Sequence, residues 1–245
     1  MNLAADFEKY WKSLISDEPA DLSSAAARHF QQTIPRFPDE AVYIYSFKEN
    51  RMIYASGWEE ILGYRDDEIN MLLIVNLSTP RFAPFSEEVN RKALKFILSK
   101  TEQLEKYSFS IELKKRHKNG AEVPIIARVG VYEVENNRVV SIIGNFRVDH
   151  SLYFGKVMRY AAYGPEREEF ELELDQTLFY EMAISNKEKE ALALAAAGYS
   201  FKEMADELGV SVSAIEKRIN PLYKRFNVKS LAHLVAFAYE NHILP

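Results

Sequence analysis

The chain has no cysteine. This absence excludes disulfides, thiolate metal sites and thiol nucleophiles together. No apolar run approaches the ~18 residues of a membrane span. The first residues, MNLAADFEKYWK, are acidic and amphipathic, whereas a secretory signal has a basic start and an apolar core. We therefore expect a protein of the cytoplasm with no membrane partner.

Basic residues are also in deficit, with 31 Lys and Arg against 36 Asp and Glu and a net charge of −5. This balance disfavours nonspecific coating of nucleic acid, so any DNA contact must be local. A length of 245 residues with 47% hydrophobic residues is sufficient for two ordinary domains. The sequence has no Gly-rich phosphate loop, metal-ligand cluster or catalytic-triad spacing. We therefore expect no enzyme activity and no metal site.

The last quarter of the chain predicts three short helices. Two Ser-x-x-Glu capping boxes predict helix starts, glycines that accept left-handed backbone predict helix ends, and a further serine caps the third helix. In that order, these residues are Ser185 and Glu188, Ser200 and Glu203, Gly198 and Gly209, and Ser211. Two helices joined by a short Gly-containing turn are typical of the helix-turn-helix motif.

The third helix has one apolar stripe, predicted to pack on the first two helices. It consists of Ile215, Ile219, Leu222, Tyr223 and Phe226. The other side is polar and basic. Residues 211–229 hold the bases Lys217, Arg218, Lys224, Arg225 and Lys229 and the acid Glu216, so the local charge is 5 − 1 = +4. Such a contrast with the acidic chain favours phosphate binding. A solvated helix of an ordinary bundle is the alternative.

This segment resembles the LuxR-type helix-turn-helix of bacterial transcription regulators. The matching positions are Glu188, Leu192, Gly198, residues 200–205, Leu208, Val210, Ser213, Ile215, Tyr223 and Val228. In such proteins the third helix lies in the major groove and the final helix pairs two copies. The resemblance implies double-stranded DNA as partner and a homodimer, and leaves RNA polymerase open as a further partner.

By this resemblance, Glu216, Lys217 and Asn220 face base edges. The whole predicted DNA-binding set is Lys202, Ser211, Ser213, Glu216, Lys217, Arg218, Asn220, Lys224 and Lys229. Two departures from the family pattern stand out. Glu216 replaces a usual base, and it can accept a hydrogen bond from cytosine N4 but is repelled by phosphate. Pro221 is expected to kink or interrupt the helix. A protein-interaction adaptor that keeps the fold but has lost DNA binding is therefore the alternative function.

The middle of the chain predicts an α+β domain. Strands are expected over residues 41–47, 50–56, 107–114, 123–133 and 139–148, with short helices before a longer helix that Ser86 caps. Asn119 and Gly120 mark a hairpin turn. Across residues 39–149 this order resembles a PAS domain: residues 53–56 lead to Trp58, then come the turn at 61–64 and the late hairpin at 118–120. We expect a PAS-like antiparallel sheet with flanking helices, followed by an all-α domain.

PAS domains use the sheet and its facing helices to enclose a small molecule or to pair with another protein. The candidate pocket residues are Phe82, Phe85, Val89, Phe96, Phe109, Ile111 and Ile143. A packed aromatic core is the alternative. The photoactive flavin type of PAS domain needs a cysteine and is excluded. Haem is not expected, because no histidine lies within residues 57–100, where haem-binding relatives place one. The cofactor, if there is one, stays unknown.

The predicted organisation has four parts. Amphipathic helices for dimerisation or capping occupy residues 1–38, the PAS-like domain 39–150, an acidic linker 151–182 and the LuxR-type domain 183–245. Two apolar faces are the candidates for holding a dimer. They are Phe7, Trp11 and Leu14 near the start of the chain and Leu234, Phe237 and Tyr239 near its end.

Overall fold

The computed structural model describes residues 15–152, 154, 158–175, 183–241 and 243–244. The chain divides into two compact units. The N-terminal unit consists of residues 1–152 and 161–177, and the C-terminal unit of residues 153–160 and 178–245. The predicted N-terminal dimer face of Phe7, Trp11 and Leu14 lies outside the described residues.

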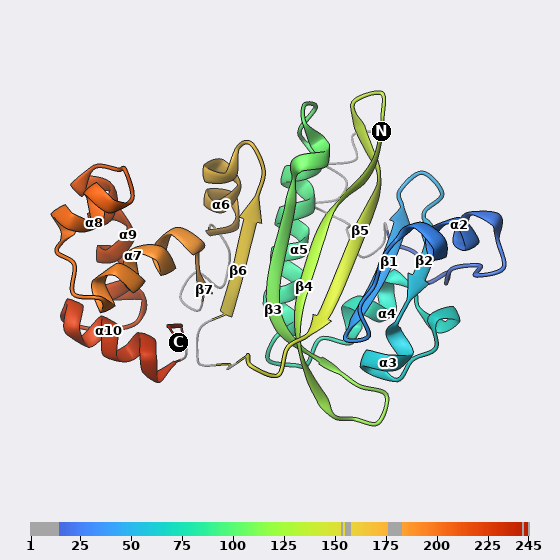
Figure 1. Ribbon diagram of the computed structural model, residues 1–245, viewed down its shortest axis with the longest axis horizontal. Helices are drawn as coiled ribbons and strands as arrows, with labels where there is room; N and C mark the ends of the chain where they lie inside the picture. Colours follow the sequence, from blue (N-terminus) through green and yellow to red (C-terminus); the bar gives the residue numbers. More distant parts are fainter. Residues whose placement is uncertain (1–14, 153, 155–157, 176–182, 242, 245) are drawn as a thin grey trace. The chain divides into compact units, whose positions relative to one another are not determined.

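An antiparallel sheet forms the centre of the N-terminal unit (Figure 1). Its strands are β1 (Glu40–Ser46), β2 (Arg51–Ser56), β3 (Ser108–Arg116), β4 (Glu122–Glu135) and β5 (Arg138–Val148), in the order β2-β1-β5-β4-β3. Strands β3, β4 and β5 form the predicted meander, and β1 pairs with both β2 and β5. The turn after β3 holds Gly120 at φ 93°, a left-handed conformation that favours glycine. The predicted PAS-like sheet is confirmed.

Two further strands involve the segment that was predicted to be an acidic linker. Strand β6 (Met158–Tyr163) follows β3 in the strand order, and β7 (Ala183–Ile184) pairs with β6 in parallel, with Met158 opposite Ala183. The boundary between the two units falls within β6. Helix α6 (Arg167–Asp175) follows β6, so this segment has regular structure.

Helices cover both faces of the sheet. On one face, α2 (Ala25–Thr33) packs Ala27 and Phe30 against Ile44 and Tyr54. On the other face lie α3 (Trp58–Leu62), the 3₁₀ turn η2 (Asp66–Glu68), α4 (Met71–Asn76) and α5 (Ala83–Leu98), with η3 (Leu104–Lys106) leading into β3 (Figure 1). The expected cap at Ser86 is wrong. Helix α5 begins at Ala83 with a proline in its first turn, and Ser86 lies buried inside the helix.

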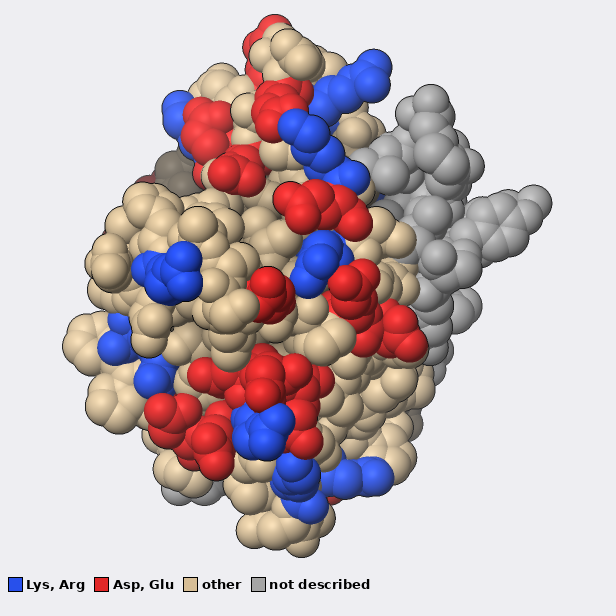
Figure 2. Space-filling model, turned by 90° about the vertical axis from the view of Figure 1, so that its right-hand side faces the viewer, with Lys and Arg blue, Asp and Glu red and all other residues tan. Residues whose placement is uncertain are grey.

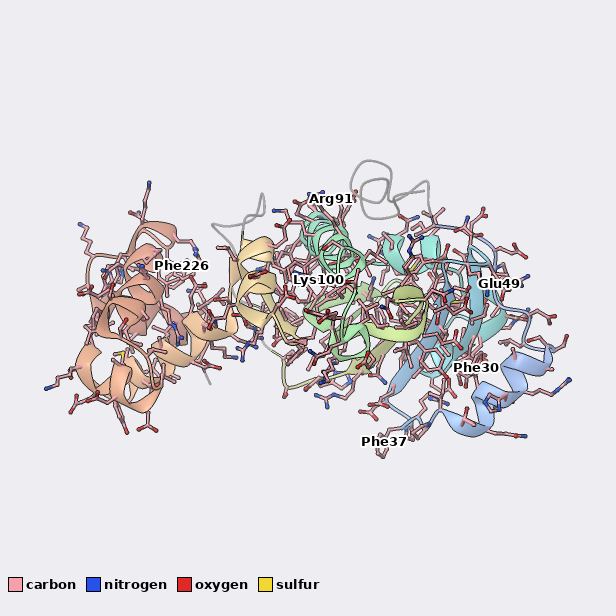
Figure 3. The ribbon with its side chains drawn as sticks, turned by 90° about the horizontal axis from the view of Figure 1, so that it is seen from above. Phe30, Phe37, Glu49, Arg91, Lys100 and Phe226 are labelled. Atoms are coloured by element: carbon pink, nitrogen blue, oxygen red, sulfur yellow. The ribbon has the colours of Figure 1, made fainter. Side chains whose placement is uncertain are left out.

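Helix α6 docks on α5 through one aromatic stack and two lysines. The rings of Phe96 and Phe170 are parallel, with centroids 4.5 Å apart. Lys92 Nζ donates to the Glu173 carbonyl oxygen at 3.3 Å, and Lys100 pairs with Glu166 at the start of α6. Lys100, labelled in Figure 3, lies just after the end of α5. These contacts make α6 part of the N-terminal unit.

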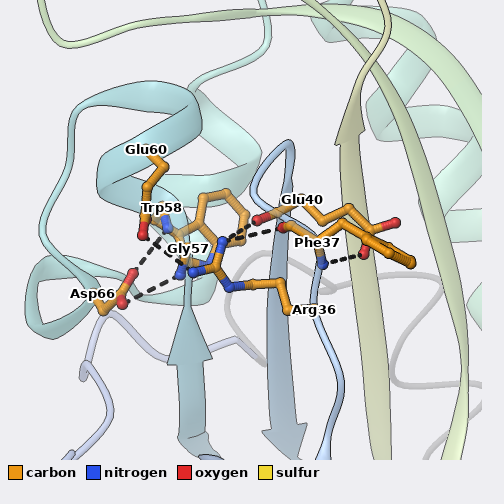
Figure 4. Close-up of polar contacts among 7 residues, drawn as sticks. All are labelled: Arg36, Phe37, Glu40, Gly57, Trp58, Glu60 and Asp66. Atoms are coloured by element: carbon orange, nitrogen blue, oxygen red, sulfur yellow. Dashed lines mark hydrogen bonds and ion pairs between the residues drawn. The ribbon is translucent and has the colours of Figure 1, made fainter.

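The entry to β1 is fixed by Arg36 (Figure 4). Its Nη1 donates to the Glu40 carbonyl oxygen at 2.9 Å, and its Nη2 lies 3.1 Å from the Glu60 carboxylate. Gly57 beside it adopts φ 87°, and a Cβ there would lie 2.4 Å from the Glu40 carbonyl oxygen. This approach requires glycine. On the side of the unit around α2 and β2, the described acidic and basic side chains are interspersed (Figure 2).

The C-terminal unit contains α7 (Asn186–Ala196), α8 (Phe201–Glu207), α9 (Val212–Arg225) and α10 (Leu231–Glu240). One apolar core joins these helices. Its fully buried members include Leu192, Met204, Ile215, Ile219, Leu222 and Leu234. Within the described part of the chain, no helix is both long enough and apolar enough to cross a membrane.

Candidate nucleic-acid interface and sensory cavity

Both predicted capping boxes are present in the C-terminal unit. Glu188 accepts from the Ser185 backbone N–H at 2.9 Å, and Glu203 accepts from the Ser200 backbone N–H at 2.8 Å. The Ser200 hydroxyl and then its backbone N–H lower the pKa of Glu203 below its usual value, because both donate to the charged carboxylate. Ser211 caps α9 by accepting from the Ala214 N–H at 3.2 Å. The helix starts are therefore set locally, as the sequence predicts.

Residues with left-handed backbone conformation end helices α7, α8 and α9. Gly198, Gly209 and Asn227 have φ values of 91°, 63° and 53°. After each, a backbone N–H bonds back to a carbonyl five residues earlier. These bonds are Tyr199 to Leu194 at 3.1 Å, Val210 to Ala205 at 2.9 Å and Val228 to Tyr223 at 2.9 Å. This is the Schellman arrangement, and it keeps the joint between α8 and α9 short. The structure therefore contains the predicted helix-turn-helix.

Helix α9 has one buried side and one exposed side. Ile215, Ile219 and Leu222 have no exposed surface. The predicted DNA-binding residues of α9 and its two flanks, together with Lys202 of α8, are exposed, with one exception. The exposed ones are Lys202, Ser211, Ser213, Glu216, Lys217, Asn220, Lys224 and Lys229. The exception is Arg218, which is half-buried, and its Nη1 atom has no hydrogen-bond partner among the described residues.

Helix α9 continues through Pro221, so the expected interruption does not occur. Proline removes the backbone bond that position 221 would donate to the Lys217 carbonyl. Ile219 and Leu222, on either side of the missing hydrogen bond, are both fully buried and anchor the helix to the core there. The exposed side of α9 therefore extends over the full helix.

A buried ion pair joins the start of α7 to the end of α9. Arg225 Nη2 lies 2.9 Å from Glu188 Oε1, and the side chains are 2% and 8% exposed. Arg225 therefore does not add to the charge of the outer surface. For residues 211–229 the bases Lys217, Arg218, Lys224 and Lys229 then stand against Glu216, and the charge is 4 − 1 = +3. A sequence signal was available, because position 225 follows Leu222 by one helical turn and belongs to the inward side.

The expected dimer face at the end of the chain is only partly exposed. Leu234 is fully buried in the core of its own unit, so its assignment to a dimer face is wrong. Phe237 is half-buried and stacks on Phe226 with centroids 4.8 Å apart. Tyr239 is 49% exposed. Leu234 and Phe237 pack within the core of their own unit. Of the expected dimer face, Tyr239 is therefore the residue available to a partner.

A cavity of about 30 Å³ lies between α4, α5 and the sheet. About 10–15 Å³ accommodates one water, so the cavity holds roughly two. Its polar wall includes Lys115 from β3, Ser86 and Asn90 from α5, and Tyr43 from β1. Asn90 Nδ2 donates to the Ser86 carbonyl oxygen at 2.7 Å. Its apolar wall includes Met71, Ile74, Leu113 and Phe146.

Lys115 is the most unusual group in this cavity. It is buried, with 3% of its surface exposed, and its Nζ donates to the Ile74 carbonyl oxygen and, at 3.1 Å, to Ser78 Oγ. Burial away from water lowers its pKa from 10.5 to about 7. The sequence interpretation missed this residue. The signal was the period of β3: Phe109, Ile111 and Leu113 point inward, and Lys115 is the next position in that series.

The structure separates the predicted pocket residues. Ile111 lines the cavity. Most of the others are buried but do not belong to its wall. These are Phe82, Phe85, Val89, Phe96 and Phe109. Ile143 packs on the opposite face of the sheet, with Ala27 and Phe30 of α2. Among the described residues no group of three or more His, Cys, Asp or Glu side chains is arranged to hold a metal ion.

Comparison with known proteins supports the assignment of the C-terminal unit. Residues 182–238 match the family described as bacterial regulatory proteins, luxR family. No curated protein sequence matches the chain. The chain therefore contains a PAS-like domain followed in sequence by a LuxR-type helix-turn-helix domain.

Several solved structures resemble the chain at low identity. The phage VqmA–DPO complex is 16% identical over 89% of this chain and 88% of that one, with a TM-score of 0.37. The VqmA dimer of Vibrio cholerae is 14% identical over 90% and 89%, also with a TM-score of 0.37. A PAS domain of a Colwellia psychrerythraea protein is 16% identical over 51% of this chain and 98% of that one, with a TM-score of 0.39.

Proposed function

We propose that this chain is a sequence-specific transcriptional regulator that reads DNA with α9 and responds to a small molecule in its PAS-like domain. The observation that carries the proposal is the exposed polar and basic side of α9, presented on a helix-turn-helix that matches the luxR family. We assign sensing to residues 39–150 and DNA binding to residues 183–245. No metal and no enzyme activity enters this proposal.

Two kinds of DNA contact follow from the exposed side of α9. Lys217 and Asn220 lie about one turn apart, and their side chains suit guanine and adenine edges in the major groove. Glu216 suits the amino group of cytosine. Lys224 lies near the end of the helix and suits phosphate, which fixes position without reading sequence. Together these contacts predict a site that is specific but salt-dependent.

The cavity supports the sensing part of the proposal. Lys115 supplies a donor whose only hydrogen-bond partners among the described residues are the Ile74 carbonyl and the Ser78 hydroxyl. A ligand with a hydrogen-bond acceptor can bind this donor, and the apolar wall of the cavity can contact the remainder of the ligand. Because the cavity holds only about two waters, binding of a larger molecule requires α4 or α5 to move outward.

Selection from a random DNA pool with the full-length protein tests DNA reading. We expect one preferred sequence. Lys217→Ala and Asn220→Ala should each cost about 1–3 kcal/mol on that sequence and relax preference at one position. Lys224→Ala should weaken binding to selected and random DNA alike. Lys48→Ala, on an exposed lysine of the N-terminal unit, is the control and should change neither.

Two results would contradict these assignments. Equal losses on selected and random DNA for Lys217→Ala and Asn220→Ala would remove base reading from these residues. If the intact protein selects no sequence, the adaptor function is favoured, since Glu216 places a negative charge on the surface that would face DNA.

We further propose that the regulator acts as a homodimer, because two half-sites one helical turn apart need two recognition helices at a fixed separation. Changing Phe7 and Trp11 together to Asp should give monomers at micromolar concentration and weaken operator binding, since each domain then docks without the effective concentration of its partner. Sedimentation measures the outcome. A variant that stays dimeric with full operator affinity would exclude this face as the dimer contact.

A further inference from the structure

The exposed side of α9 carries one apolar residue. Within that helix the exposed positions are Val212, Ser213, Glu216, Lys217, Asn220 and Lys224, and all but the first are polar or charged. Val212 is 40% exposed. By contrast, Ile215, Ile219 and Leu222 of the same helix have no exposed surface. Val212 is therefore not part of the inward stripe, and it belongs to neither the buried core nor the half-buried residues packed on it.

The local fold does not require valine at this position. Val212 is the first residue of α9, directly after the cap Ser211, whose hydroxyl accepts from the Ala214 N–H. A helix start is stabilised by an acidic residue in the first turn, and α9 has none there. A β-branched residue is no better than average for a helix. What valine does provide is a stiff apolar surface, because branching at Cβ restricts its χ1 angle.

The position of Val212 is also the one that reaches bases in helix-turn-helix proteins. The N-terminal residues of a recognition helix contact base edges while the helix lies in the major groove. Val212, Glu216 and Asn220 follow one another at intervals of four residues, so they lie on one side of the helix. Thymine C5-methyl is the apolar group that base pairs present in the major groove.

Resting on the proposed DNA-binding function, we propose that Val212 reads a thymine methyl group and thereby sets preference for an A·T pair at one position of each half-site. Glu216 and Asn220 read polar base edges further along the same side of α9. The recognition surface thus combines one apolar contact at the start of the helix with polar contacts after it.

Replacing thymine by deoxyuridine tests the proposal, because this change removes the C5-methyl and keeps every hydrogen-bonding group. The operator selected by the full-length protein is synthesised with each thymine replaced in turn. One thymine per half-site should show a loss of about four-fold, equivalent to the ~0.8 kcal/mol gained by burying one methyl-sized group. Replacement at the other contacted thymines should have little effect.

The valine itself is tested by three variants. Val212→Ser, which has no methyl group, should lose sensitivity to deoxyuridine at that position. Val212→Thr retains one methyl group and should keep a reduced sensitivity. The matched control is Val134→Ser, since Val134 is an exposed valine of similar exposure, 38%, in strand β4 of the N-terminal unit. That control should reproduce the profile of the unchanged protein.

The outcomes separate this inference from the function on which it rests. Failure to select any operator would overturn the proposed function. A protein that selects an operator but shows no methyl-sensitive thymine, or a Val212→Ser variant with the unchanged profile, would overturn the role of Val212 alone. Val212 would then be one of the isolated apolar residues that protein surfaces commonly expose.

Discussion

Lys115 makes the stability of the N-terminal unit depend on pH in a way that one substitution should remove. The perturbation is Lys115→Met, which keeps an unbranched side chain of similar length but carries no charge. The two oxygens that accept from Lys115, the Ile74 carbonyl and Ser78 Oγ, then lose their donor. Each buried acceptor left without a partner costs about 1–3 kcal/mol. This cost is nearly independent of pH.

The charge of Lys115 supplies the pH-dependent part. Burial lowers its pKa from 10.5 to about 7, which corresponds to ~5 kcal/mol between its two protonation states. Between about pH 7 and pH 10 the unfolded chain holds the proton and the folded chain does not, so stability rises with pH. Below about pH 7 both states hold it, and the folded protein bears the full cost of a buried charge. The variant should therefore gain most over the unchanged protein at pH 6 and least at pH 10.

Denaturant unfolding from pH 6 to pH 10 measures this difference. Trp58 is fully buried, and its ring centroid lies 5.1 Å from that of Phe146. Lys115 Nζ lies 5.7 Å from the centroid of the same Phe146 ring. The fluorescence of Trp58 therefore reports on the core around Lys115. A Trp11→Phe background leaves Trp58 as the single tryptophan. Lys114→Met is the control, because Lys114 pairs with Glu122 at the surface. Parallel pH profiles for Lys115→Met and the unchanged protein would refute the lowered pKa.

Two further predictions concern the C-terminal unit. Pro221→Ala should stabilise this unit by as much as ~3 kcal/mol and raise its melting temperature, because α9 is continuous and gains a backbone hydrogen bond. A lower melting temperature would mean that the proline supports the helix. Arg225→Met should cost about 3–5 kcal/mol by leaving Glu188 buried without its partner, and adding Glu188→Gln should recover part of that loss; circular dichroism at 222 nm during heating measures both.

Local signals in the sequence predicted most of the two folds. Alternation in β3 and β4 and the Asn-Gly turn predicted the meander, because side chains of a strand point to opposite faces in turn. Serine caps and left-handed glycines predicted α7, α8 and the start of α9, because those bonds form between near neighbours. Such features need no knowledge of what the segment packs against.

The segment after β5 was harder to interpret for the opposite reason. Its acidic residues predicted a linker, yet α6 is held by Phe96 and Lys92 of α5 and by Lys100 just after that helix, about 70 residues earlier in the chain. Of its own residues, Phe170 and Leu174 are fully buried. Two apolar positions in an acidic stretch give a weak pattern, and only the partner surface decides whether the helix docks.

The missed functional groups have a common physical basis. Lys115 and Arg225 occupy inward positions in the period of a strand and of a helix, but the sequence interpretation did not consider Lys115 and counted Arg225 with the basic residues of the surface. Each is stabilised inside by oxygens that lie far away in the sequence, the Ile74 carbonyl for Lys115 and the Glu188 carboxylate for Arg225. A charged residue that falls in phase with an apolar stripe therefore predicts a buried partner, and its chemistry follows from whether that partner is neutral or charged. Lys115 has only neutral oxygens as partners, and its burial lowers its pKa, whereas Arg225 forms an ion pair with the Glu188 carboxylate.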